Sequence, residues 1–415
     1  MKKRLLFVSP RFLFPVDSGG KIRTTQILRG LKGGAFEITL VSPASRHDLR
    51  AFSGELDSVA DRYVHWPQRR PVLLATLLRY ASLFDALPVP IAIDRSWAGS
   101  RVLHTQLMMD PDIVIFDFPH SAVLAKKMPS VTTLLFTHNV EAEIFKRHAA
   151  VNSGIKNLIW RSQYRKMVQY ERTTLKKFET VIAVSARDAE HFCNEYGVTN
   201  VEVISTGVDS DYFRYHVPAD EPEIVFIGSM DWLANIDAID YFMEDVWPLL
   251  ERSLPDTSMT VVGRNPPAWL VRKAENRRLR WRFTGFVDDV RESVRKAALC
   301  VIPLRIGGGT RLKVYEAMAM GCPIVSTPIG VEGLPVVAGE HYLCAETADE
   351  FAGQVSRLLL DRQLRAVFSR AARRFVEAHC SQLTVVKQFE RICNAAIENS
   401  PHCNNTKTTL SGRLA

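Results

Sequence analysis

Two successive series of short apolar segments constrain the fold of this chain more than any other feature of its sequence. Short runs of β-branched and aromatic residues are typical of buried parallel strands. Their alternation with helical segments predicts parallel sheets covered by helices on both faces. The first series comprises Arg4–Ser9, Phe36–Ser42, Asp112–Phe118, Thr132–His138, Thr180–Ser185 and Val201–Ser205. The second comprises Glu223–Gly228, Ser258–Gly263, Trp281–Gly285, Leu299–Pro303, Pro323–Thr327 and Tyr342–Ala345.

The break between the two series predicts two doubly wound α/β domains. Residues 209–222, rich in Asp, Tyr and Pro, have no clear period and are the expected linker. We therefore predict an N-terminal domain over 1–208 and a second domain with C-terminal helices over 223–399. The polar tail 400–415 is expected to be disordered. Ligands of such sheets bind outside the carboxyl ends of the strands, so the expected site is a cleft between the domains.

The composition narrows the cellular setting and the class of partner. The seven cysteines are scattered and never form a Cys-x-x-Cys pair, which favours a reducing compartment over a zinc module. No secretory signal or apolar stretch of about 20 residues is visible, so we expect a cytoplasmic protein. The net charge of +8 admits nucleic acid, an anionic membrane or a phosphorylated substrate as partner. No recognised nucleic-acid motif is present.

The most informative segment is residues 301–334, in which a strand, a glycine loop, a helix, a tight turn and a second strand follow one another. The loop Gly307-Gly308-Gly309 lets a ligand approach the main chain, and Thr310 is a good helix N-cap. Free N–H groups and the positive dipole end of the helix suit a diphosphate. Arg311 and Lys313 add cations, and the Glu316 carboxylate could accept ribose hydroxyls.

This segment resembles the donor-binding region of the retaining group 1 glycosyltransferases, glycosyltransferase family 4, which have the GT-B fold. The stretch from Glu316 to Pro323, EAMAMGCP, matches the family's E-A-M-A-x-G-x-P pattern. Further matches in the expected order are FPVDSGG at 14–20, THNVE at 137–141, FIGSMDW at 226–232, VVGR at 261–264 and FTGFVDD at 283–289. The 226–232 match resembles a bacterial exopolysaccharide subgroup. The resemblance implies a nucleotide diphosphate sugar as donor and places Gly228 and Arg264 in its site.

The sequence departs from the family pattern at two places. Many members carry a second glutamate eight positions before the equivalent of Glu316, where this chain has Gly308. Sugar recognition is then expected from backbone amides around Gly308, Gly309, Thr310 and Arg311. Many members also carry an Arg and a Lys after the first strand of the second domain, where this chain reads GSMDW at 228–232. Arg311 and Lys313 are the candidate substitutes.

In the first domain, the loop before the first helix and one histidine are the candidate site residues. Gly19 and Gly20, with Lys21 and Arg23 behind them, suit a loop over the diphosphate and the acceptor, or an ordinary strand-to-helix connection. His138 ends a predicted strand and matches the family's active-site histidine, which contacts the sugar or the acceptor. Asp117, Glu141 and Glu143 rank below it.

The chemistry implied by the resemblance is sugar transfer with retention. Without a confident carboxylate nucleophile, front-side attack through an oxocarbenium-like state is the favoured route, with His138, Lys313 and Arg311 as the catalytic candidates. The protein would act mainly by stabilising charge on the departing diphosphate. No cofactor or metal is expected, and the Asp209-Ser210-Asp211 triplet is read as a turn in the linker.

A basic stretch in the first domain leaves the membrane question open. Residues 146–178 carry nine Lys and Arg against Glu171 alone, and Trp160, Tyr164, Met167, Val168, Leu175 and Phe178 form one helical stripe. The stripe either packs on its own domain or lies on anionic lipid. The tract 69–87 is similar, and together they favour a lipid-linked acceptor and a peripheral position on the inner face of the cell membrane.

Three functions remain in competition. The leading hypothesis is a retaining hexosyltransferase in exopolysaccharide or cell-envelope glycan assembly that acts on a glycan or a lipid-linked acceptor. A sugar-nucleotide epimerase built on the same two domains needs no acceptor. A non-catalytic protein that binds membrane or nucleic acid is compatible with the net charge.

Overall fold

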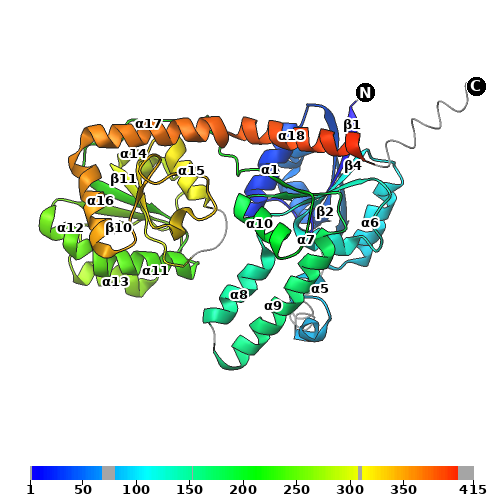
Figure 1. Ribbon diagram of the computed structural model, residues 1–415, viewed down its shortest axis with the longest axis horizontal. Coiled ribbons are helices and arrows are strands. Elements are labelled where there is room, and N and C mark those ends of the chain that lie inside the picture. The colour runs from blue at the N-terminus through cyan, green and yellow to red at the C-terminus, as the bar shows by residue number, and fades with distance from the viewer. Residues whose placement is uncertain (1, 68–79, 152, 307–310, 401–415) are drawn as a thin grey trace, which may run out of the picture. The chain divides into compact units, whose positions relative to one another are not determined.

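A computed structural model of the chain describes residues 2–67, 80–151, 153–306 and 311–400. These described residues form two compact units, divided after Ser205 and after Thr384, with the segments before and after 206–384 in the first unit and 206–384 itself the second. Each unit contains one parallel sheet covered by helices (Figure 1). The predicted pair of doubly wound α/β domains is confirmed.

The first unit is built on a seven-stranded sheet with the order β3-β2-β1-β4-β5-β6-β7. Its strands are β1 (Lys3–Val8), β2 (Phe36–Ala44), β3 (Arg62–Pro67), β4 (Ile113–Asp117), β5 (Thr132–Phe136), β6 (Thr180–Ala183) and β7 (Val201–Val203). Its helices are α1 (Gly19–Leu31), α2 (Arg46–Ala51), α3 (Ser53–Val59), η1 (Ser82–Phe84), α5 (Val89–Asp94), α6 (Trp97–Leu107), α7 (Phe118–Ser121), η2 (Ala122–Leu124), α8 (Glu141–Val151), α9 (Gly154–Leu175), α10 (Ala186–Asn194) and α18 (Gln382–Asn399).

The second unit contains a six-stranded sheet with the order β10-β9-β8-β11-β12-β13. Its strands are β8 (Glu223–Ile227), β9 (Ser258–Val262), β10 (Trp281–Phe283), β11 (Leu299–Ile302), β12 (Ile324–Ser326) and β13 (Leu343–Cys344). Its helices are α11 (Leu233–Tyr241), η3 (Phe242–Val246), α12 (Trp247–Ser253), α13 (Ala268–Asn276), α14 (Arg291–Lys296), α15 (Leu312–Ala319), η4 (Ile329–Val331), α16 (Ala348–Leu360) and α17 (Arg362–His379).

Both sheets reverse their strand order at one point, and that point positions the candidate site. In the first sheet, chain order runs outward from β1 on one side and from β4 on the other. In the second, the reversal lies between β8 and β11. In open parallel sheets, ligands bind beside the carboxyl ends of the strands at this switch point.

The final helix belongs to the first unit, which corrects the predicted domain boundary. The chain returns from the second unit after Thr384, and residues from Val385 onward join the first. Val385, Val386, Phe389, Ile392 and Cys393 are buried in the core of the first sheet, and the Phe389 ring contacts Phe136 edge-on at 5.3 Å. An amphipathic sequence shows that a helix buries one face but not against which domain.

Some smaller predictions also need correction. The edge strand β3 was missed because its side chains are mostly exposed, so its apolar run is short. Helix α1 begins at Gly19, so Gly19 and Gly20 lie in the helix rather than in the expected loop before it. Residues 209–222, the expected linker, belong to the second unit. Ser400, the first residue of the predicted tail 400–415, is buried, and residues 401–415 lie outside the described part of the chain.

Replacing Phe389 by Ala tests where α18 packs. Truncating a buried phenylalanine costs about 3–5 kcal/mol of stability, and the loss should fall on the first unit. Hydrogen exchange measured by mass spectrometry should speed up in β1, β4 and β5 but not in β8–β13. Leu383→Ala, on the exposed part of the same helix, is the matched control and should change little. Loss of protection confined to β8–β13 would contradict this assignment.

Candidate functional site

In the second unit, three chain segments meet beyond the switch point of the sheet. Residues 228–232 follow β8, residues 263–267 follow β9, and α15 starts at Leu312 after β11. The first two approach backbone to backbone, because a Cβ on Gly263 would lie 1.9 Å from the Gly228 carbonyl oxygen. A Cβ on Gly228 would lie 2.8 Å from the Asn235 amide nitrogen. Only glycine permits both approaches.

A hydrogen-bond relay connects two cations across these segments. The Lys313 ammonium donates to Asn235 Oδ1 at 2.9 Å, and Asn235 Nδ2 donates to the Ser229 carbonyl at 2.7 Å. On the far side, Arg264 Nε donates to Ser229 Oγ at 3.2 Å and to Asp231 Oδ2 at 2.6 Å. We call Lys313, Asn235, Ser229 and Arg264, with Asp231, the cation relay. It holds a lysine and an arginine at the two ends of one loop.

The sequence pointed to only part of this relay. Lys313, Gly228 and Arg264 were predicted site residues, and the structure brings all three to the loop after β8. The roles of Asn235, Ser229 and Asp231 were missed. The available signal in the sequence was an asparagine between the apolar residues Ala234 and Ile236. Such an asparagine is expected to be buried, and a buried amide needs partners for both its donor and its acceptor.

Burial brings the pKa values of two side chains on α15 close to 7. Desolvation, together with the Arg311 charge, lowers the pKa of Lys313 to about 7, while Cys300 and Glu316 act against the shift. Desolvation likewise raises the pKa of Glu316 to about 7, opposed by Lys313. The Lys313 ammonium also lies 4.4 Å from the centre of the Phe226 ring. A lysine balanced near neutrality gains its charge when an anion binds beside it.

At the relay's other end, an acid orients the arginine. Asp231 accepts from Arg264 and, at 2.8 Å, from Asn265 Nδ2. Hydrogen bonds from Asn265, Ser229 and Arg264 lower the pKa of Asp231, so its carboxylate stays ionised. Arg264 is about half exposed. Its remaining donors are therefore available to a ligand in solution.

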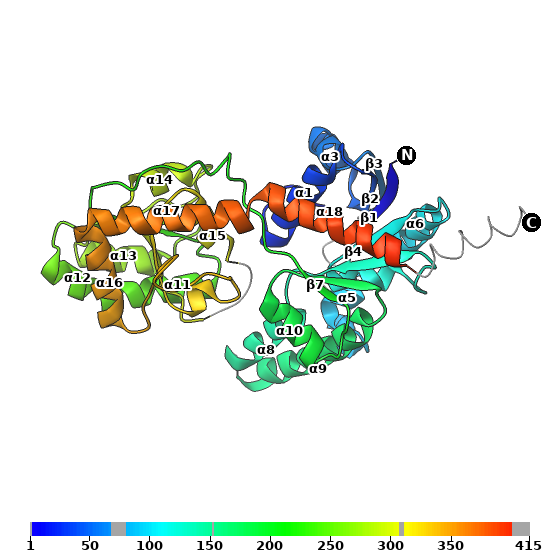
Figure 2. The same cartoon turned by 45° about the horizontal axis from the view of Figure 1, so that its top comes forward.

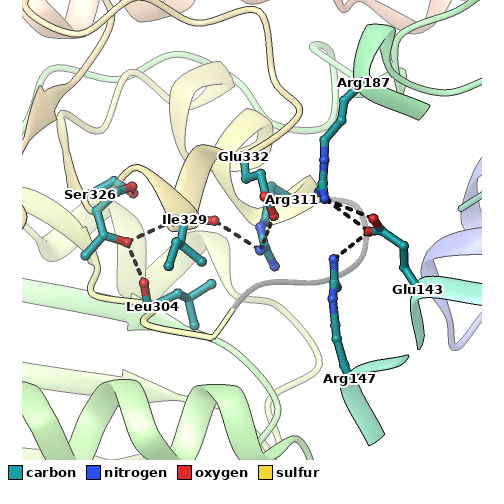
Figure 3. A network of polar contacts seen from close by, with 10 residues as sticks. Glu143, Arg147, Arg187, Leu304, Arg311, Ser326, Ile329 and Glu332 are labelled. Atoms are coloured by element: carbon teal, nitrogen blue, oxygen red, sulfur yellow. Dashed lines mark hydrogen bonds and ion pairs between the residues drawn. The ribbon is translucent and has the colours of Figure 1, made fainter. Parts of the chain in front are cut away.

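Arg311 faces the inside of its own domain. Its side chain is buried, with Nη2 donating to the Ile329 carbonyl at 3.0 Å and lying 4.0 Å from the Glu332 carboxylate (Figure 3). This arrangement anchors the start of α15 to η4. The predicted site residues Gly308, Gly309 and Thr310 lie outside the described residues.

In the first unit, a buried polar cluster lies at the carboxyl ends of β4 and β5. Asp117 accepts hydrogen bonds from Ser9 Oγ at 3.1 Å, Thr24 Oγ1 at 3.0 Å and His138 Nε2 at 2.7 Å. The other ring nitrogen, Nδ1, lies 2.8 Å from Arg23 Nη1. A guanidinium can only donate, so Nδ1 accepts and Nε2 carries the proton. Desolvation lowers the pKa of His138, which keeps the ring neutral.

Phe118 covers this histidine from a strained backbone position. Its φ of 62° lies in the left-handed region, which a bulky residue rarely adopts. The Phe118 ring lies 3.9 Å from the His138 ring, centre to centre. A Cβ on Gly20 would lie 2.5 Å from the same ring, so this glycine allows α1 to approach. Gly19, the first residue of α1, follows the N-cap residue Ser18, whose side chain makes no capping hydrogen bond. The predicted residues Gly20 and His138 therefore meet around Phe118.

The helix that follows His138 is held at its start by a buried acid that the sequence did not single out. Glu171 accepts from the backbone N–H groups of Glu141 at 2.8 Å and Ala142 at 3.0 Å. Desolvation raises the pKa of Glu171 to about 8. Glu143, in the first turn of α8, forms ion pairs with Arg147 and Arg187 (Figure 3).

The Asp209–Asp211 triplet forms a turn. Asp209 Oδ1 accepts from the backbone N–H groups of Asp211 at 3.0 Å and Tyr212 at 2.9 Å. Within the described part of the chain, no three His, Cys, Asp or Glu side chains gather as metal ligands. No helix among these residues is long and apolar enough to cross a bilayer.

Models of two glycosyltransferase families match consecutive parts of the chain. Residues 18–212 match the model described as Glycosyltransferase Family 4, and residues 221–361 match the model described as Glycosyl transferases group 1. These findings support a group 1 glycosyltransferase. A protein from Klebsiella pneumoniae, described as an uncharacterized 44.6 kDa protein in the cps region, is 18% identical over 85% of this chain and 90% of its own length.

Solved structures show that the fold of this glycosyltransferase is GT-B. Sucrose-phosphate synthase from Thermosynechococcus elongatus superposes with a TM-score of 0.68 at 15% identity, covering 96% of this chain and all of that one. Alr3699/HepE from Anabaena, solved in complex with UDP, gives a TM-score of 0.65 at 14% identity over 95% of this chain and all of its own. The predicted fold is thus confirmed.

Asp117→Asn tests whether the buried cluster holds the first unit together. An amide would place donor hydrogens against the donors of Ser9, Thr24 or His138, and the substitution would remove the carboxylate charge that these donors now surround. Breaking a buried ionic cluster in this way costs roughly 3–5 kcal/mol. Hydrogen exchange in β1, β4 and β5 should accelerate accordingly.

Asp110→Asn is the control for this substitution, because the Asp110 side chain is almost fully exposed beside Arg4. Exposed ion pairs contribute about 0–1 kcal/mol. Equal effects of the two substitutions would show that the cluster does not stabilise the first unit.

Proposed function

We propose that this glycosyltransferase transfers a sugar with retention from a nucleotide diphosphate donor to a glycan or lipid-linked acceptor. The cation relay is the observation that carries the proposal. The chain lacks the Arg and Lys that many family members carry after the first strand of this domain, and Lys313 and Arg264 bring two cations to that same loop. Two fixed positive groups suit a diphosphate, whose charge increases as it leaves.

In the proposed reaction, the acceptor hydroxyl attacks the anomeric carbon on the face from which the diphosphate departs. The bond between that carbon and the diphosphate oxygen breaks, and the hydroxyl proton passes to the departing oxygen. Lys313 and Arg264 stabilise the leaving group, and we propose a metal-independent transfer. Arg311 adds positive field and anchors α15, while Glu316 binds the ribose.

The acceptor side of the proposal rests on the first unit. His138 is neutral, and the sugar or acceptor would contact it after movement of the Phe118 ring, which now covers it. Gly19 and Gly20 start α1 beside that ring. The Anabaena protein was also solved with UDP-glucose, which supports a UDP-sugar as the first donor to test.

The cellular role that we propose is exopolysaccharide or other cell-envelope glycan assembly at the cytoplasmic side. The Klebsiella relative in the cps region supports it. The epimerase alternative is not favoured, since both family models describe sugar transferases.

Calorimetric titration with UDP-, GDP- and ADP-sugars tests the proposal. Failure to bind any of a broad panel would refute it.

Lys313→Met removes one cation while keeping a long apolar stem beside Phe226. Loss of one preorganised donor typically costs about 3–4 kcal/mol of barrier, a 10²–10³-fold fall in kcat. The measurement is the initial rate of sugar transfer or donor hydrolysis with the donor identified by titration. Lys296→Met, at an exposed lysine of the same unit that pairs with Glu292, should retain full activity. Full activity of the Lys313 variant would remove this lysine from the mechanism.

The pKa of Lys313, about 7 in the free protein, also predicts a pH dependence of donor binding. The charged form binds the diphosphate, and its fraction falls as pH rises above 7. Donor affinity should therefore weaken by up to about tenfold per pH unit between pH 7.5 and 9. Calorimetry at pH 8 in buffers of different ionisation enthalpy should show proton uptake. Lys313→Met should abolish the part of both effects that is due to the lysine, and Glu316→Gln removes the part due to the neighbouring acid.

A further inference from the structure

Three large apolar side chains are exposed to solvent at the start of α9, in the first unit. Ile155 is 77% exposed, Leu158 65% and Ile159 37%. Their spacing, i, i+3 and i+4, places them on one helix face. Figures 1 and 2 show that α8 and α9 run side by side as a hairpin, with the start of α9 at the end remote from the sheet. Single exposed apolar residues are common, but a cluster at the end of a hairpin marks an interaction surface.

A fourth apolar side chain is held beside the same helix. The Lys166 ammonium donates to the Leu83 carbonyl at 2.8 Å and to the Asp85 carbonyl at 2.6 Å. These bonds fix the chain on both sides of Phe84, whose ring is 93% exposed. Lys166 follows Ile159 by seven residues, so it lies on the same face about 10 Å along the helix. We call Phe84, Ile155, Leu158 and Ile159 the hairpin patch.

The hairpin patch is not a displaced piece of the domain core. The opposite face of α9 already packs inward, with Met167 and Leu175 buried in the first unit, as is Phe178 just after the helix. The Trp160 ring braces the hairpin from within, 5.9 Å from Phe145 and 4.5 Å from His148. The predicted apolar stripe thus packs on its own domain, and the exposed patch is a separate set of residues.

The exposed charged residues of α9 and of the turn after it are all cations, while Asp85, next to Phe84, is paired with Arg95. The exposed cations of α8, α9 and the turn after α9 are Lys146, Lys156, Arg161, Arg165, Arg172, Lys176 and Lys177. Between residues 144 and 178 the sequence contains a single acid, Glu171, and it is fully buried under the start of α8. No exposed carboxylate from this segment therefore offsets the cations. Apolar side chains inserted beside a row of Lys and Arg are the combination that binds anionic lipid.

We infer that the α8–α9 hairpin docks on the surface of an anionic bilayer, with the hairpin patch inserted among the headgroups and the cations above them. This role is separate from the proposed donor chemistry, because none of these residues belongs to the cation relay. It would keep the first unit at the membrane surface, where a lipid-linked acceptor is presented. A free glycan acceptor would not require such a surface.

Vesicle flotation with the full-length protein tests this inference. Vesicles of phosphatidylcholine alone are compared with vesicles containing 30% phosphatidylglycerol. We expect at least tenfold stronger partitioning to the anionic vesicles, weakening as salt is raised. Ile155→Ser with Leu158→Ser should reduce partitioning by about tenfold or more. Arg161→Gln with Arg165→Gln should reduce it by roughly fivefold per cation and flatten the salt dependence.

Leu360→Ser is the matched control, since Leu360 is equally exposed at the end of α16 in the second unit. It should leave partitioning unchanged. Binding that is absent, or equal for both vesicle types, would overturn the inference. So would analytical ultracentrifugation showing a dimer that the Ile155/Leu158 variant dissociates, because the patch would then join two copies. Calorimetric donor titration of the same variants should match the unsubstituted protein, which separates this result from failure of the donor site.

Discussion

The close approach of two glycine backbones, Gly228 and Gly263, is the constraint on which the second unit's site depends. It lets the loop after β8 contact the loop after β9, so that Ser229 can bind Arg264 while its carbonyl receives Asn235. Asn235 in turn fixes Lys313 on α15. A side chain at either glycine would separate the segments and with them the two cations. Backbone contact thus determines where charge is placed.

The first unit uses burial differently. Its switch point is filled by Asp117, Arg23 and His138, which are hydrogen-bonded through the imidazole, and burial lowers the pKa of that imidazole against the effect of Asp117. Phe118 covers the histidine from a strained conformation. Strain of this kind persists only where the surroundings enforce it, and it is common at functional sites. Both units therefore place polar groups at the carboxyl ends of their central strands, one around two cations and the other around a shielded histidine.

The two sheets could be predicted from the sequence, because strands buried on both faces appear as apolar runs. The donor-side helix could also be predicted, because the segment with Lys313 and Glu316 resembles the donor-binding region of a known family. The partners of those residues could not. Asn235 and Asp231 matter through contacts between segments far apart in the chain, which no local pattern encodes. The assignment of the final helix to the second domain was wrong for the same reason, since a helix's apolar face does not specify its partner. Met167 belongs to the predicted apolar stripe and is buried, whereas Ile155 lies outside that stripe and its exposure is known only from the structure.

Hydrogen exchange of the full-length protein, with and without the nucleotide sugar selected by titration, tests the central claim most directly. The claim is that the cation relay receives the donor's diphosphate. We predict slower exchange at residues 228–235, 263–265 and 311–316, with α16 unchanged as an internal reference. Protection that is absent from all three segments, while calorimetry still reports tight binding, would place the donor elsewhere and contradict the account.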